Sequence, residues 1–245
     1  METTVIYLTD NMLDEKITLL CRRNILESIG DIPLISVSHK PIDFGVNICV
    51  GPMERNSLTI NKQMMKALET VKTKYIAIAE HDCLYTPEHF AFIPPDDNVS
   101  YYNENVWLMQ LYSAGHPEFN GMFSMFRGRK ANSQLICSTK IMIETTQARI
   151  DIMGDPAWMA KYPTGRVGEA GHMDYNHAMR LSRGRSLSLI REKLKEYIEK
   201  YKGENFNTNL PNIDIRHKNN FTKNRRGSKR RYELPYWGKM EDIIK

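Results

Sequence analysis

The chain has 245 residues, of which 41% are hydrophobic and 26% charged, and its formal net charge is +5. This is the composition of an ordinary globular protein that is long enough to bury a substantial core, and no run of about 18 apolar residues exists that would cross a membrane. No signal-peptide pattern opens the chain, and its four cysteines are scattered without CxxC pairing, which favours reduced thiols in a cytoplasm.

The first 82 residues alternate between buried, strand-like runs and helical patterns. A β-α-β-α-β order of this kind favours a parallel sheet with helices on its faces. The predicted segments are, in order, strand 4–9, helix 12–28 (closed by Gly30), strand 33–41, helix 58–72 and strand 75–80.

The remainder of the chain is less regular. Residues 105–113 and 121–127 read as strands that could pair antiparallel, and the helical spacing in 186–201 predicts one apolar side that includes Leu189 and Leu194. We find no repeat or low-complexity linker and predict one domain, residues 1–215, followed by a basic segment, residues 216–245. The other predicted elements are strand 134–138, helix 139–153, helix 173–184 and strand 212–217.

Polar residues follow the predicted strands where those strands end. In a parallel sheet, ligands bind beyond the carboxyl ends of the strands, so these residues should converge on one rim. They are Thr9 and Asp10, then Ser38, His39 and Lys40, and finally Glu80, His81 and Asp82.

The third of these groups has the chemistry of a cation site. In an extended chain, Glu80 and Asp82 share a face while His81 points away. Two carboxylates suit Mg²⁺ or Mn²⁺, which leave other positions for water and phosphate oxygens. The simpler interpretation is a solvated acidic turn, but the buried strand before it favours the cation.

A strand that ends in E-x-D, third in a β-α-β-α-β start, resembles the nucleotide-sugar site of GT-A fold glycosyltransferases. The resemblance implies an α/β, Rossmann-like single domain with a mixed, mainly parallel central sheet flanked by helices. It also implies a Mn²⁺ or Mg²⁺ cofactor with Asp82 as principal ligand, while Glu80 binds the metal or the ribose. Here the first acid is Glu and the centre is His, which departs from the family's D-x-D. The nucleotide-sugar site would also include Thr9, Asp10, His39, Asn61, Lys62 and Gln63.

Two later segments fit the same resemblance. Residues 168–184 resemble the acidic pair and helix of inverting enzymes, in which a carboxylate takes a proton from the acceptor hydroxyl. Asp174 is the first candidate for this general base and Glu169 the second, although Asp174 could equally be a helix N-terminal residue. His217, at the end of the last predicted strand, would be an additional metal ligand.

The net charge is concentrated near the end of the chain. Residues 216–231 hold eight Lys or Arg and no acid, which leaves −3 on the rest. Such a strip suits a polyanion such as duplex DNA, to which it gives affinity without sequence preference. The expected DNA-binding residues are Lys218, Lys223, Arg225, Arg226, Lys229, Arg230 and Arg231.

The end of the chain carries a narrower resemblance. Its R-H-x-x-N-x-T and L-P-Y-W-G segments resemble phage-type glycosyltransferases grouped with base J glucosyltransferase and the TET/JBP-associated enzymes. This implies a UDP-sugar donor, an acceptor of hydroxymethylated pyrimidines in double-stranded DNA, and a cytoplasmic location (a host cytoplasm if phage-encoded). Tyr232, Tyr236 and Trp237 could stack on bases or pack the tail onto the body.

Three alternatives stay open from the sequence. The acceptor could be a glycan, a lipid-linked sugar or a protein, with the basic strip against another acidic polymer or a membrane surface. The acids could instead serve a metal-dependent nuclease or nucleotidyltransferase, although such sites usually cluster more carboxylates. The chain could also be a non-catalytic DNA-binding module.

Overall fold

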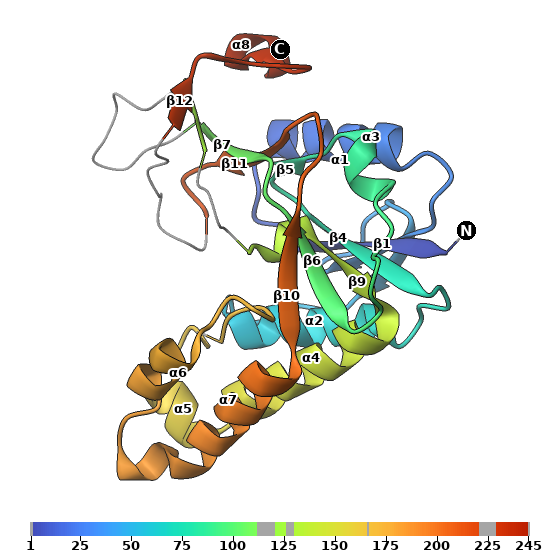
Figure 1. Ribbon diagram of the computed structural model, residues 1–245. Coiled ribbons are helices and arrows are strands. Elements are labelled where there is room, and N and C mark those ends of the chain that lie inside the picture. The colour runs from blue at the N-terminus through green and yellow to red at the C-terminus, as the bar shows by residue number, and fades with distance from the viewer. Residues whose placement is uncertain (1, 112–120, 126–129, 166, 221–228, 245) are drawn as a thin grey trace.

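A seven-stranded central sheet organises the protein in the computed structural model, which describes residues 2–111, 121–125, 130–165, 167–220 and 229–244. The strand order is β10-β6-β9-β4-β1-β2-β3, and only β9 runs antiparallel to its neighbours. The predicted fold class, a mixed and mainly parallel sheet flanked by helices, is therefore confirmed (Figure 1). The strands are β1 (Thr3–Thr9), β2 (Leu34–Ser38), β3 (Val46–Cys49), β4 (Tyr75–Glu80), β6 (Val99–Asn103), β9 (Leu135–Ser138) and β10 (Lys202–Phe206).

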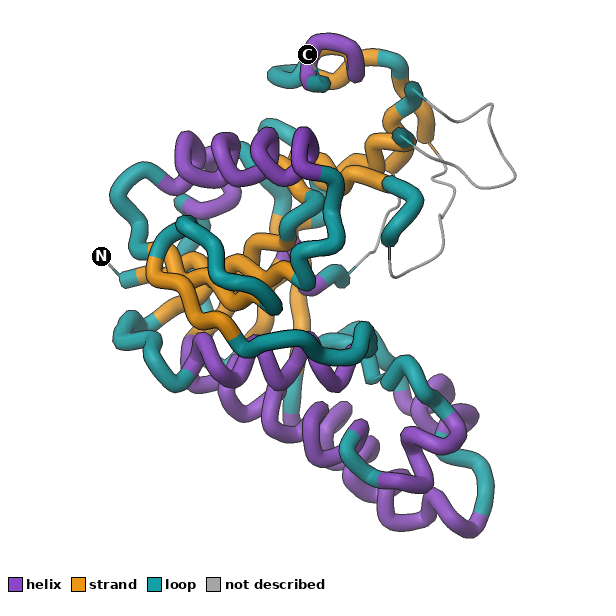
Figure 2. Tube along the Cα trace, turned by 180° about the vertical axis from the view of Figure 1, so that it is seen from behind, coloured by secondary structure: helices purple, strands orange, loops and turns teal. Residues whose placement is uncertain are grey.

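Helices cover both faces of this sheet, because side chains alternate along each strand. On β1, Val5 and Tyr7 pack toward α1 (Glu15–Ile29) and α3 (Pro87–Phe90). Ile6 and Leu8 pack in a second cluster with side chains of the other two helices. Those helices are α2 (Ser57–Leu68) and α4 (Thr139–Met153), seen on the opposite side of the sheet in Figure 2.

A smaller sheet of five strands, ordered β12-β8-β7-β11-β5, packs beside the first. The predicted antiparallel pairing of β7 with β8 is present, and β11 lies parallel to β7 and antiparallel to β5. Its core includes Trp107, Phe123, Ile213 and Ile215 together with Leu234 of the C-terminal segment. The strands are β5 (Cys83–Leu84), β7 (Val106–Gln110), β8 (Phe123–Met125), β11 (Asn212–Arg216) and β12 (Lys229–Arg231), followed by the hairpin β13 (Glu233–Leu234) and β14 (Gly238–Lys239) and by α8 (Met240–Ile243).

A helical lobe extends from the end of α4 (Figure 1). It consists of α5 (Pro156–Lys161), α6 (Tyr175–Leu181) and α7 (Ser188–Lys200), which pack with α4 around the buried Trp158. The expected position of Leu189 on the apolar side of the last helix is wrong. Leu189 is 77% exposed, and the neighbouring Ile190 is buried with Leu194 instead, because residues four positions apart share a helix face whereas residues five apart do not.

The sequence missed several short elements, and several helix ends differ from prediction by a few residues. The missed elements are the strands β3, β5, β6, β10, β12, β13 and β14 and the helices α3, α5 and α8. No helix among the described residues combines the length and the apolar character needed to cross a bilayer. The four cysteines form no disulfide, and only Cys49 is exposed.

Candidate functional site

A cavity of about 310 Å³ opens at the carboxyl ends of β1, β2 and β4, where the sequence predicted a rim. Its described lining comes from segments as far apart as Leu8 and Asn220. The lining carries six carboxylates and four Lys or Arg side chains, a formal balance of −2 with histidines neutral. The acids are Asp10, Glu54, Glu80, Asp82, Glu169 and Asp214, and the cations are Arg55, Lys130, Arg149 and Arg216.

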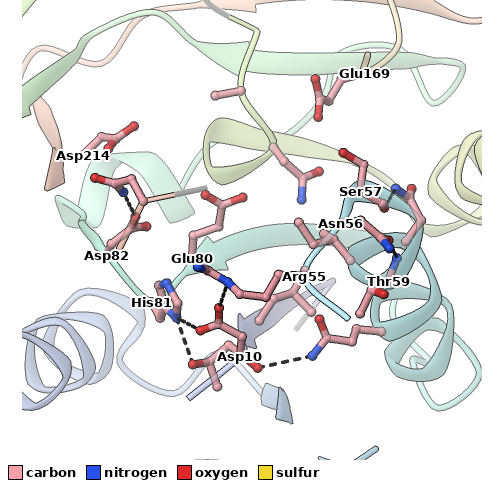
Figure 3. A pocket seen from close by; sticks show the side chains of 18 of the residues that line it. Asp10, Arg55, Asn56, Ser57, Thr59, Glu80, His81, Asp82, Glu169 and Asp214 are labelled. Atoms are coloured by element: carbon pink, nitrogen blue, oxygen red, sulfur yellow. Dashed lines mark hydrogen bonds and ion pairs between the residues drawn. The ribbon is translucent and has the colours of Figure 1, made fainter. Parts of the chain in front are cut away.

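Asp82 is the centre of the acidic side of this pocket (Figure 3). Ligand atoms of His81, Asp82 and His217 lie within 4.8 Å of one another, and a second set within the same limit consists of Glu80, Asp82 and Cys83. Burial raises the pKa of the Cys83 thiol well above its usual value, so this thiol is a poor metal ligand. The first set, one carboxylate and two imidazoles, is therefore the better cation site, and it suits Mn²⁺.

The charge of Asp82 is stabilised despite its burial. Burial opposes ionisation, but the interaction with the adjacent His217, and then those with His81 and Arg216, outweigh it and lower the pKa of Asp82 to about 2. Asn220 Nδ2 also donates to Asp82 Oδ2 at 2.9 Å. Asp82 is thus a fixed, ionised carboxylate at neutral pH.

His217 approaches Asp82 from the end of β11, and the sequence had placed it at a strand end. Its Nε2 lies 3.5 Å from Asp82 Oδ2 and is buried without a well-formed hydrogen bond. The backbone N–H of Asn219 donates to His217 Nδ1 at 3.3 Å, which places the proton of a neutral ring on Nε2. Coordination of a metal through Nε2 would require the ring proton to move to Nδ1, which would displace the hydrogen bond from the Asn219 N–H.

The expectation that His81 points away from the two acids is wrong. The chain forms a turn at His81 and Asp82 and does not continue as an extended strand, so all three side chains of the E-H-D stretch line the pocket. His81 Nδ1 lies 2.9 Å from Thr9 Oγ1 and 3.7 Å from Asp10 Oδ1. The histidine therefore connects the E-H-D turn to the end of β1.

Arg55, which the sequence analysis did not select, organises the other end of the pocket. Its Nε lies 2.6 Å from Asp10 Oδ2, and its guanidinium donates to the Asn219 carbonyl at 2.8 Å. Gln63 Nε2 donates to the Thr9 carbonyl at 3.2 Å from α2. These contacts tie the end of β1 to the turn that follows His217.

The remaining predicted nucleotide-binding residues divide into two groups. His39 lines the pocket with its Nε2 buried and unpaired, and burial lowers its pKa in spite of the nearby Asp10. Asn61 also lines the pocket, although its amide donates to the Ser57 carbonyl. Lys62 is exposed and is not among the described lining residues.

The two candidate general bases occupy different positions. Glu169 lines the pocket and pairs with Arg149 at 3.3 Å, with side chains 20% and 7% exposed. Asp174 does not line the pocket as described, and its Oδ1 accepts the backbone N–H of His177 at 2.7 Å as the N-cap of α6. The geometry favours Glu169 over Asp174.

Two further polar residues of the pocket, Asp214 and Arg216, were missed. They lie 3.2 Å apart on β11 and are both buried, while Ile213 and Ile215 pack into the core on the other face. The alternation of apolar and charged residues in "NIDIR" is the signal that could have identified them, since a buried strand whose second face is charged must line a polar site.

Of the predicted DNA-binding residues, Lys218, Lys229, Arg230 and Arg231 are exposed. Lys223, Arg225 and Arg226 lie outside the described residues. Arg216 lines the pocket, so the basic segment, residues 216–231, begins at the pocket itself.

No family model matches the chain, and no curated protein matches it. Similar solved structures include S. aureus TarS in complex with UDP-GlcNAc, at 10% identity over 90% of this chain and 60% of that one, with a TM-score of 0.46. A glycosyltransferase involved in glycosylation of the major capsid of PBCV-1 is 10% identical over 82% of this chain and 81% of that one, with a TM-score of 0.42. The glycosyltransferase GlyE of Streptococcus pneumoniae TIGR4 is 10% identical over 82% and 45%, with a TM-score of 0.37. The chain thus spans less than two thirds of the length of TarS and of GlyE. At these low identities the comparisons do not establish a function, which has to be argued from the side chains of the pocket.

Proposed function

We propose that the protein is a metal-dependent glycosyltransferase that moves a sugar from a nucleotide-sugar, a UDP-sugar, to a 5-hydroxymethylpyrimidine base in DNA. The observation that carries this proposal is the buried, ionised Asp82 between His81 and His217, at the carboxyl edge of the sheet and inside a polar pocket. Ligands of α/β proteins bind at this edge.

The charge of the pocket explains why a cation is needed. The described lining has a formal balance of −2, so a ligand that carries a diphosphate would be repelled without compensation. The His81, Asp82 and His217 set fits Mn²⁺ or Mg²⁺, with Glu80 close by. When bound there, the cation would offset the negative charge of the departing diphosphate.

The contacts at the far end of the pocket suit a nucleoside. Asp10 and the carbonyl of Thr9 present oxygen atoms that are held in place by Arg55 and Gln63. Oxygen acceptors of this kind match the hydroxyls of a ribose and the N–H of a uracil ring. We therefore assign the nucleoside to the β1 end and the diphosphate to the Asp82 end.

Glu169 is the general base in the proposed reaction, with Asp174 as the alternative. The carboxylate takes the proton of the hydroxymethyl group while that oxygen forms a bond to the anomeric carbon of the sugar. The bond between this carbon and the diphosphate oxygen breaks, and its electron pair leaves with the nucleotide. Because this is a single displacement, the configuration at the anomeric carbon inverts. Arg149 fixes the orientation of Glu169 through their ion pair.

The DNA acceptor is supported by charge. Eight Lys or Arg lie within residues 216–231 of a chain whose remainder is −3, and this segment starts at the pocket. Neutralised phosphates release counterions, so such a segment gives strong but salt-dependent binding to DNA.

A transfer assay tests the proposal. DNA that contains 5-hydroxymethylcytosine or 5-hydroxymethyluracil is incubated with the protein, Mn²⁺ and a panel of nucleotide-sugars, then digested to nucleosides and weighed by mass spectrometry. We expect a sugar-sized mass gain that disappears with EDTA and in Asp82→Asn. Release of UDP without a mass gain on either DNA would support glycosyltransferase activity but refute the DNA acceptor. The acceptor would then be a glycan, a lipid-linked sugar or a protein. Absence of both would refute the proposed function.

A further inference from the structure

The aromatic residues at the C-terminal hairpin differ in what they contact. Trp237 is half-buried in the core of the smaller sheet, and its Nε1 donates to the Pro211 carbonyl at 2.6 Å. Tyr232 is 71% exposed and Tyr236 is 59% exposed. Trp237 therefore packs the tail onto the body, whereas the two tyrosines present their rings to solvent.

Tyr236 also has an unfavourable backbone conformation. The Trp237 N–H donates to the Leu234 carbonyl at 3.2 Å, which closes a turn with Pro235 and Tyr236 at its centre. The φ of Tyr236 is +72°, and a turn with Pro first and a positive φ second is type II, which favours Gly or Asn at the second position. Among the described residues, Asn11 alone shares a positive φ without being glycine, and asparagine tolerates it.

Packing does not compensate for this strain. The Tyr236 ring contacts the edge of Trp237, with ring centroids 4.8 Å apart, but most of its surface stays in water. A strained residue whose side chain is largely unburied suggests a function that requires the side chain.

Cations directly precede Tyr232 in the chain. All three residues of β12, Lys229 to Arg231, are exposed, and Tyr232 follows directly. The Arg231 guanidinium lies 5.4 Å from the Trp107 ring centroid, which orients it. Glu233, the acid of the hairpin, lies opposite Lys239 in the register, so a lysine of the same hairpin offsets its charge.

We propose that Tyr232 and Tyr236 are a stacking surface for unpaired nucleic-acid bases, with the phosphates of the same strand on β12. Exposed rings beside exposed cations are what single-strand binding needs, because each base offers a π-face and each linkage a charge. An intact duplex offers phosphates to the cations but hides its bases from the rings. The inference rests on the proposed DNA acceptor and extends it: the protein would hold DNA whose strands are locally opened, as access to a base hydroxymethyl group demands.

Tyr236→Gly gives a sharp test, because glycine removes the ring and also relieves the backbone strain. With the full chain and fluorescein-labelled oligonucleotides of about 20 nucleotides, fluorescence anisotropy measures the Kd for a single strand and for the matching duplex at several salt concentrations. We expect Tyr236→Gly to weaken single-strand binding by about 5- to 150-fold, equivalent to about 1–3 kcal/mol, while its Tm rises. Duplex affinity should change by less than about twofold.

Control variants separate stacking from other effects. Tyr236→Phe keeps the ring and should bind single strands as the wild type does. Tyr175→Ala removes an exposed tyrosine from α6, in the helical lobe at the other end of the molecule, and should change nothing (Figure 1). Lys229→Ala should weaken single strands and duplexes alike and reduce the salt dependence.

Several results would overturn the inference. Unchanged single-strand affinity in Tyr236→Gly, or an equal loss on single strands and duplexes, would exclude stacking. If Tyr236→Gly binds DNA as the wild type does but no longer binds anionic phospholipid vesicles, the tyrosines contact a membrane surface instead. The transfer assay keeps the two proposals distinct: ring-dependent single-strand binding without sugar transfer would refute only the proposed function, and transfer with ring-independent binding would refute only this inference.

Discussion

Replacement of each candidate base by its amide, Glu169→Gln and Asp174→Asn, decides which carboxylate takes the proton. Glu169 pairs with Arg149 in a largely buried position, and the Nε of that arginine already lacks a partner. An amide at 169 keeps an acceptor oxygen but removes the charge, so we expect a loss of about 1–3 kcal/mol in the free energy of unfolding. Loss of the general base should lower kcat by about 10²- to 10⁴-fold.

The same change at Asp174 should have almost no effect. Its Oδ1 caps α6 through the His177 N–H, and asparagine is as good an N-cap as aspartate, so stability should shift by only a few tenths of a kcal/mol. Urea unfolding at pH 7 measures the stabilities, and initial rates of sugar transfer at saturating donor measure kcat. A large loss of kcat in Asp174→Asn, with Glu169→Gln active within a few-fold, would refute the assignment.

Three further predictions concern the fold and the metal site. Burial lowers the pKa of His89 to about 3 from its ordinary value of 6.5, so the unfolded chain binds more protons than the folded chain between these values. When the pH falls from 6.5 to 4.5, the free energy of unfolding measured in urea should drop by about 2.3 kcal/mol more in the wild type than in His89→Phe, and equal drops would contradict this. Mn²⁺ at about 100 times its Kd should raise the free energy of unfolding of the wild type, measured by calorimetry, by about 2.7 kcal/mol, and should not stabilise Asp82→Asn. Equal stabilisation of both proteins would mean that the ion binds elsewhere. In Gly203→Ala the new Cβ would overlap the carbonyl oxygen of Ala170, so we expect the free energy of unfolding measured in urea to fall by about 1–3 kcal/mol. An unchanged free energy of unfolding would mean that β10 and the loop that contains Ala170 separate easily.

The alternation of strands and helices at the start of the chain was predictable because each element buries a distinct apolar face. The rim was predictable because the polarity of the sequence changes where the strand ends. Residues Tyr75 to Ala79 of β4 are buried, and the charged Glu80 follows them. Strand β10 could not be predicted in this way. It is an edge strand whose residues are half-exposed or exposed, and its pairing with β6 depends on the backbone.

Side chains that act through distant partners left no local signal. Arg55 lies in a loop, and its partners Asp10 and Asn219 are separated from it by 45 and 164 positions in the chain. The orientation of His81 depends on a turn, which the extended-strand assumption excluded. Conversely, Asp174 has the local sequence of a base at a helix start, but a cap is a complete explanation of its contacts.

The place of β11 in the smaller sheet has a consequence for synthesis of the protein. This strand pairs with β7 on one side and β5 on the other, although both partners leave the ribosome about 100 residues or more before it. Until residue 216 emerges, the nascent chain would hold two open strand edges and a pocket that lacks Asp214 and Arg216. Such edges are templates for aggregation, so a chaperone that covers them during translation should raise the yield of folded protein. Fragments that end before residue 212 should be insoluble as well as inactive.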